Sequence, residues 1–130
     1  MALYLNPNAD AFQEDKKTRI YIDKSLLISE LNNIVSTKDD FICISRPRRF
    51  GKSMAGNMIS AYYSKGCDTR DIFSQMKLCQ CPDYDKYLNK FNVIKLDLNE
   101  LYQKSQTEDL GTDLISFIQK AVTDEFREKY

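Results

Sequence analysis

The pattern of apolar and polar residues predicts short strands that alternate with helices. Strand-like stretches occur at residues 19–23, 41–45 and 91–98. Residues 19–23 alternate in polarity, which is typical of a strand with one buried face, whereas residues 41–45 are largely apolar, as expected of a strand buried on both faces. Strands separated by helices favour an α/β fold with a parallel sheet flanked by helices.

Apolar residues at helical spacing predict the intervening helices. The expected helices are the stretch that carries Leu27 and Leu31, residues 54–63, the stretch with Ile72 and Phe73, residues 83–90, and residues 112–129. Asp23 or Ser25 can cap the first of these helices. Residues 1–18 are polar and contain a turn signal, so we expect a lead-in segment there and one domain over residues 19–130.

The junction between the second strand and the second helix carries the clearest chemical signal. Gly51-Lys52-Ser53 follows a basic turn and opens directly into the helical pattern. Strand, loop, Gly-Lys-Ser and helix is the order of a phosphate-binding P-loop, in which the helix N-terminus receives the phosphates. Lys52 would contact the β- and γ-phosphates, and the Ser53 hydroxyl would coordinate Mg²⁺.

This loop departs from the usual pattern G-x-x-x-x-G-K-[ST] at its first glycine. Arg46 stands there, and Pro47 restricts both its own φ and the conformation of Arg46. Three guanidinium groups at the expected phosphate position suit anion binding. The nucleotide-binding candidates are therefore Arg46, Pro47, Arg48, Arg49, Phe50, Gly51, Lys52, Ser53 and Met54.

Composition fits a single domain without a strong electrostatic bias. The 130 residues carry a formal net charge of zero, so nucleic-acid binding would require a local basic patch. No apolar run is long enough to span a membrane and no signal peptide is recognisable, which predicts a cytoplasmic protein. The four cysteines match no usual zinc spacing in a chain without histidine, so reduced structural thiols are expected.

Three segments resemble the AAA-ATPase-like family, a predicted AAA-ATPase family of anaerobic bacteria. SRPRRFGKS at residues 45–53 is similar to the family's P-loop variant, which has arginine at the position of Arg46. YIDKS at residues 21–25 resembles a family box upstream of that loop, and residues 88–94 resemble the segment before the next core strand. The resemblance extends over nearly the whole chain.

The resemblance implies ATP and Mg²⁺ as ligands of a variant Walker A loop. It places Asp23 and Lys24 near the nucleotide. It also implies that this chain is the N-terminal portion of a longer ATPase, because relatives continue for several hundred residues, often into a nuclease-like domain. Nucleic acid would contact only that further domain, and hydrolysis would need residues beyond position 130.

Asp97 is the candidate for a second acidic group. It ends the third predicted strand, where a P-loop NTPase places an aspartate that helps to hold Mg²⁺. Lys95 interrupts the apolar run, and no second acid follows directly. A residue that caps a strand end is therefore the alternative interpretation of Asp97.

Two other functions remain open from the residues alone. Arg46, Arg48, Arg49 and Lys52 could grip a nucleic-acid backbone, in which case binding would weaken steeply with salt and would not need Mg²⁺. The domain could instead keep this loop for packing only and act as an inert interaction domain. Lys52→Ala would then leave every activity unchanged.

Overall fold

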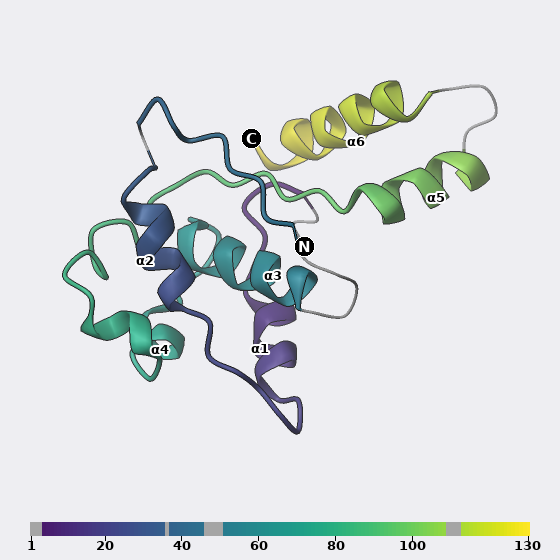
Figure 1. Cartoon of the computed structure of the whole chain (residues 1–130). Helices are drawn as coiled ribbons and strands as arrows, with labels where there is room; N and C mark the ends of the chain where they lie inside the picture. Colours follow the sequence, from purple (N-terminus) through teal and green to yellow (C-terminus); the bar gives the residue numbers. More distant parts are fainter. Residues whose placement is uncertain (1–3, 36, 46–50, 109–112) are drawn as a thin grey trace.

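The computed structural model describes residues 4–35, 37–45, 51–108 and 113–130, and these residues form a helical structure (Figure 1). The elements are α1 (Asp10–Lys16), α2 (Leu26–Asn32), α3 (Lys52–Tyr63), α4 (Arg70–Phe73), the 3-10 helix η1 (Lys77–Gln80), α5 (Leu98–Glu108) and α6 (Leu114–Lys129). Within the described ranges, no β-strand is formed, and the extended segments make only two isolated bridges.

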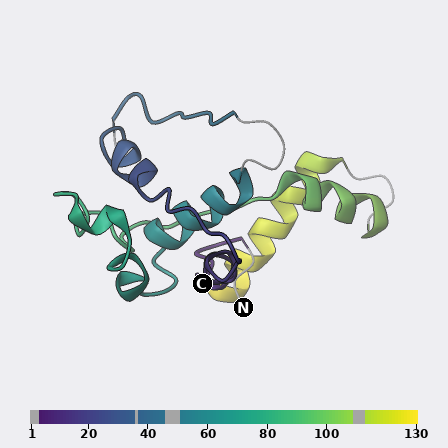
Figure 2. The same ribbon diagram turned by 60° about the horizontal axis from the view of Figure 1, so that its bottom comes forward.

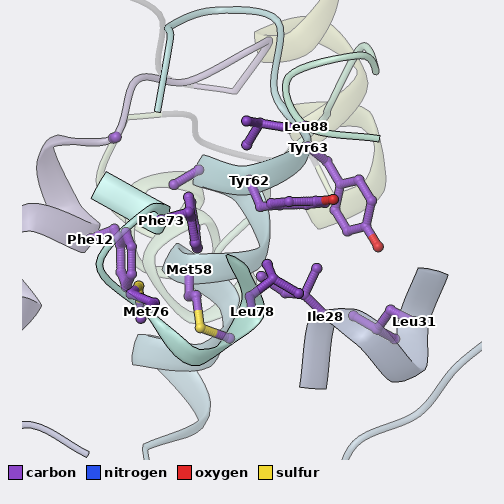
Figure 3. Packing of buried hydrophobic residues seen from close by; sticks show 12 residues of the cluster. Phe12, Ile28, Leu31, Met58, Tyr62, Tyr63, Phe73, Met76, Leu78 and Leu88 are labelled. Atoms are coloured by element: carbon purple, nitrogen blue, oxygen red, sulfur yellow. The ribbon is translucent and has the colours of Figure 1, made fainter. Parts of the chain in front are cut away.

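Helix α3 lies at the centre of the core. Its second half contributes Met58, Ala61 and Tyr62, each no more than 1% exposed. Smaller contributions come from the elements around it, namely Phe12 of α1, Ile28 and Leu31 of α2, Phe73 of α4, and Leu78 of η1 (Figure 3). The amphipathic helix that the apolar spacing over residues 54–63 predicts is therefore confirmed, because one face of α3 is buried.

Aromatic rings join the elements of the core. Tyr62 lies between Phe73 and Tyr63, with ring centroids 5.5 Å and 4.8 Å away in edge-to-face geometry (Figure 3). Phe12 stacks on the other side of Phe73 at 5.3 Å. Such pairs favour offset or edge-to-face contact, so the rings fix the relative positions of α1, α3 and α4.

Helices α5 and α6 pack against one another to one side of this core (Figures 1 and 2). The end of α6 meets the N-terminal residues, where Glu125 Oε2 accepts hydrogen bonds from the amides of Tyr4 and Leu5 at 2.8 and 3.1 Å. Lys129 Nζ donates to the Leu5 carbonyl at 3.1 Å. In the described part of the chain, no helix has both the length and the apolar character needed to cross a bilayer.

The predicted α/β fold, a parallel sheet flanked by helices, is wrong for the described residues. Residues 41–45 form no strand; they are exposed and pair with no other described segment. Phe41 is 96% exposed, although the pattern predicted a buried central strand. Figure 2 shows residues 37–45 as an arch that follows α2 and includes no strand.

The third predicted strand is also absent, because other segments take its hydrogen bonds. The Phe91 amide donates to the Tyr63 carbonyl at 2.9 Å, and the Lys95 amide donates to the Tyr4 carbonyl at 2.9 Å. The resulting bridges are Ser64 with Phe91 and Leu5 with Ile94. Two separate single bridges do not build a sheet.

Local structure elsewhere differs in part from the prediction. Residues 19–23 form no strand, and residues 83–90 form successive turns and not the expected helix. The helices after Ser25, over residues 54–63 and over residues 112–129 are confirmed as α2, α3 and α6, and the short helix with Phe73 is α4. Helices α1 and α5 were not predicted, and α1 places Phe12 of the expected lead-in segment inside the core.

Asn89 holds the C-terminal end of α3. Its Nδ2 donates to the carbonyl of Ser64 at 2.8 Å, and its Oδ1 accepts from the Thr69 amide at 3.0 Å. Its own amide donates to the Tyr62 carbonyl at 2.7 Å. The last carbonyls of a helix lack intrahelical partners, so these bonds take the place of a local C-cap.

Replacing Asn89 should therefore destabilise the fold. Asn89→Ala is expected to lower the free energy of unfolding, measured by urea denaturation, by about 2 kcal/mol. Asn89→Gly is the matched control, because Asn89 has a φ of 56° that glycine adopts without strain. It should be less damaging by about 1 kcal/mol, and unchanged stability in both variants would contradict the role of this side chain.

Candidate functional site

Gly51 sets the geometry at the start of α3. Its φ of 82° and ψ of 24° lie in the left-handed region, which glycine adopts readily. It occupies the N-cap position, where it has no side chain to hydrogen-bond the first amides of the helix. No acidic residue lies in the first turn of α3 either. A helix start of this kind presents N–H groups without intrahelical partners and the positive end of the helix dipole, which together favour an anion.

A cavity of about 480 Å³ lies on one side of this helix start. We call it the polar cavity; it is lined by Tyr4, Lys52, Ser53, Gly56, Asn57, Lys95, Leu96, Asp97, Leu98 and Glu100. Lys52, Ser53 and Asp97 are exposed side chains, so the cavity is open to solvent. The fold therefore brings the last two residues of the predicted phosphate loop to the same cavity as the candidate acid.

Asp97 also begins α5. Its Oδ1 accepts hydrogen bonds from the amides of Asn99 and Glu100, both at 3.1 Å. Asp97 therefore caps the start of a helix, whereas the alternative interpretation had it cap the end of a strand. Because both of these bonds reach Oδ1, capping and a contact with the cavity through Oδ2 are compatible.

Two residues on the wall of the polar cavity were not predicted. Lys95 Nζ donates to Asn57 Oδ1, and Asn57 Nδ2 donates to Asp15 Oδ2 at 2.8 Å. This chain of contacts joins the segment before α5 to α3 and to α1. Lys95 is a lysine within an otherwise apolar run, and that interruption was the available sequence signal.

A second cavity of about 330 Å³ lies on another side of α3. We call it the apolar cavity; it is lined by Ile20, Tyr21, Ile22, Lys24, Gly51, Met54, Ala55 and Met58. Met54, predicted among the nucleotide-binding residues, lines this cavity and not the polar one. Gly51 borders the apolar cavity and Lys52 borders the polar one, so the two cavities flank the first turn of α3.

Asp23 and Lys24 are adjacent in sequence but make different contacts. Asp23 accepts hydrogen bonds from the amides of Ser25 at 2.8 Å and Lys77 at 2.9 Å. Lys24 extends to the phosphate loop, since a Cβ built on Gly51 would lie 2.9 Å from Lys24 Nζ. Of these two candidates, Lys24 is the one whose charged group lies beside the start of α3.

The surroundings of Asp23 favour its charged form. Partial burial raises the pKa of the carboxyl, but hydrogen bonds from Ser25 and from the Lys77 amide outweigh that effect and bring the pKa below its ordinary value. Ser25 Oγ accepts from the Leu78 amide at 3.0 Å, which adds a second link to η1. This pair of residues therefore ties the segment before α2 to η1.

Five of the predicted nucleotide-binding residues lie outside the described part of the chain: Arg46, Pro47, Arg48, Arg49 and Phe50. Their neighbours on either side, residues 41–45 and Gly51, are described. Cys43, Cys67, Cys79 and Cys81 are free thiols. Among the described residues, no group of three or more histidine, cysteine or acidic side chains is placed to hold a metal ion.

Comparisons with curated proteins and with solved structures found no match. A family model described as a predicted AAA-ATPase matches residues 10–130. The match extends from α1 to the end of α6 and includes both cavities except Tyr4. It confirms the family expected from the sequence: the chain belongs to the AAA-ATPase-like family.

Proposed function

We propose that this chain binds a nucleoside triphosphate, ATP, as its Mg²⁺ complex, with the phosphates at the start of α3. The observation that carries this proposal is that Lys52, Ser53 and Asp97 line one polar cavity at that point. An ammonium group, a hydroxyl and a carboxylate there match the needs of a magnesium-bound polyphosphate. Membership of a predicted ATPase family supports the same ligand.

Each residue of this group has a distinct task in the proposal. Gly51 permits the left-handed turn that leaves the first amides of α3 open to the phosphates. Lys52 neutralises charge on the β- and γ-phosphates. Arg46, Arg48 and Arg49 add guanidinium groups, and Pro47 and Phe50 shape the same loop; these roles rest on the sequence motif.

The oxygen donors of the polar cavity fit Mg²⁺. This ion prefers hard oxygen ligands and is commonly held by one or two protein groups together with substrate phosphates. Ser53 Oγ and Asp97 Oδ2 would supply the protein ligands. The bound ion would neutralise phosphate charge, which is the chemistry required for transfer of the terminal phosphoryl group to water.

Lys24 is a second cation at the site. Its Nζ lies beside Gly51, on the side of α3 that borders the apolar cavity. A polyphosphate seated at the start of α3 would thus have Lys52 on one side and Lys24 on the other. Two flanking ammonium groups stabilise a multiply charged anion more than a single one.

Lys52→Ala should abolish detectable binding of Mg·ATP in isothermal titration calorimetry, because it removes the cation closest to the terminal phosphates. Lys38→Ala is the matched control, since Lys38 is exposed and lines neither cavity. Ser53→Ala should weaken only the Mg²⁺-dependent part of the affinity. Tight binding of Mg·ATP by Lys52→Ala would rule out the assigned role.

Asp97→Asn tests the acid separately from the helix cap. Asparagine caps helices as well as aspartate does, so α5 should be retained and the unfolding free energy should change by less than about 0.5 kcal/mol. The loss of negative charge should reduce the enhancement of ATP affinity by Mg²⁺ by about tenfold. Inorganic phosphate release, followed in the same samples, shows whether Asp97 also supports hydrolysis. An unchanged Mg²⁺ dependence would leave Asp97 with the capping role alone.

Lys24→Met should weaken ATP binding by about threefold to tenfold in isothermal titration calorimetry, because it removes one of the two cations that flank the proposed phosphate position.

Asp23→Asn should destabilise the fold by about 1 kcal/mol at neutral pH, because it weakens the hydrogen bonds that the carboxylate accepts. Because the folded-state pKa of Asp23 is lowered, its contribution is present above the unfolded pKa and is lost as the pH falls through the folded value. The stability difference between wild type and Asp23→Asn should therefore disappear in acid, and a difference that persists there would contradict this assignment.

A further inference from the structure

Lys95 is a cation of the polar cavity to which the proposed function gives no task. Its side chain is half-buried, whereas those of Lys52 and Asp97 in the same cavity are exposed. The Lys95 amide donates to the Tyr4 carbonyl at 2.9 Å, so the backbone that carries this side chain is fixed. Partial burial makes a charge costly unless a partner offsets it, so the partners of this ammonium group decide what it can do.

The side-chain partner of Lys95 is a neutral amide and not a carboxylate. Lys95 Nζ donates to Asn57 Oδ1, and Asn57 Nδ2 donates to Asp15 Oδ2 at 2.8 Å. No ion pair within the described ranges includes Lys95. The ammonium group is therefore held at the cavity wall by a hydrogen bond, but no carboxylate in direct contact neutralises its charge. A half-buried cation of this kind favours an anion in the cavity.

The contact between Asp15 and Asn57 fixes the orientation of the amide. An ionised carboxylate only accepts hydrogen bonds, so Asn57 presents its Nδ2 to Asp15 and its Oδ1 to Lys95. Asn57 lies four residues after Ser53 in α3, so both side chains share one face of the helix, about 6 Å apart along its axis. The ammonium group of Lys95 is thereby held about one helical turn from the proposed Mg²⁺ ligand Ser53.

The terminal phosphate is the part of the ligand that this position suits. Mg²⁺ bridges oxygens of the β- and γ-phosphates, and its proposed ligands Ser53 and Asp97 line the cavity together with Lys95. We propose that Lys95 binds the terminal phosphate of the triphosphate, and that Asn57 and Asp15 hold its ammonium group in position. This inference rests on the proposed function and extends it, because it assigns the preference for a triphosphate over a diphosphate to a residue outside the phosphate loop.

Lys95→Gln tests this assignment in calorimetric titrations with Mg·ATP and with Mg·ADP. Glutamine keeps a donor for Asn57 but carries no charge, so ATP affinity should fall by about tenfold and ADP affinity by less than about threefold. Lys95→Arg keeps the charge and should retain the ATP affinity of wild type within about threefold. Lys90→Gln is the matched control, because Lys90 is exposed and lines neither cavity, and both ligands should bind to it as to wild type.

A paired exchange separates ligand binding from packing. Asp15→Asn combined with Asn57→Asp swaps the carboxylate and the amide, so both hydrogen bonds and the net charge are retained. The carboxylate then contacts Lys95 directly and neutralises it. ATP affinity should again fall by about tenfold, while the thermal midpoint stays the same or rises. If Lys95 served only to join the segment before α5 to α3, the exchanged protein would bind Mg·ATP as tightly as wild type.

The outcomes distinguish the role of Lys95 from the proposed function. Equal losses of ATP and ADP affinity in Lys95→Gln would overturn the assignment to the terminal phosphate. Unchanged ATP affinity in Lys95→Gln or in the paired exchange would overturn it as well, and the phosphate site would stand, because wild type still binds Mg·ATP. Failure of wild type to bind either nucleotide would instead contradict the proposed function, and the role of Lys95 with it.

Discussion

Burial of the second half of α3 is the constraint on which both cavities depend. Tyr63 donates its hydroxyl proton to Asn32 Oδ1 at 2.5 Å, and the Tyr62 hydroxyl donates to the Tyr84 carbonyl at 2.9 Å. Burial, then the neighbouring Tyr62 and Tyr87, raise the pKa of Tyr63, so its hydroxyl remains a donor at neutral pH. These bonds, and the hydrogen bonds of Asn89 to the last carbonyls of α3, hold the C-terminal half of the helix in place. Its first turn is thereby held in place although no side chain caps it, and an anion site built on a fixed helix needs little reorganisation on binding.

The helical period separates the two kinds of surface around that first turn. Ser53 and Gly56 face the polar cavity, whereas Met54 and Met58 face the apolar one. Residues three or four apart lie on the same face of a helix, so this division follows directly from the order of side chains in the sequence.

The sequence predicts the local features of this molecule and fails where the structure depends on distant pairing. Regular apolar spacing located α2, α3 and α6, and the Gly51-Lys52-Ser53 motif coincides with the start of α3. The sheet was wrong because hydrogen bonds of residues 91–95 go to residues 4–6 and 63–65, and no spacing rule reveals such partners. Helix α1 was missed because Phe12 is the single large buried residue in a polar stretch. Asp97 was identified from its strand-like surroundings, but only the fold places it at the cavity that Lys52 and Ser53 line.

The segment before α2 links this site to the core through alternate residues. Asp23 and Lys24 are adjacent in sequence, but Asp23 contacts η1 whereas Lys24 lies beside Gly51. Asp23 accepts from the Lys77 amide, and Ser25 accepts from the amide of Leu78, a fully buried core residue. Lys24 reaches Gly51 from the same short segment. Residues 23–25 therefore contact both η1, through Asp23 and Ser25, and the start of α3, through Lys24. The hydrogen bonds that position Lys24 beside Gly51 are thus the same bonds that hold this segment against the core.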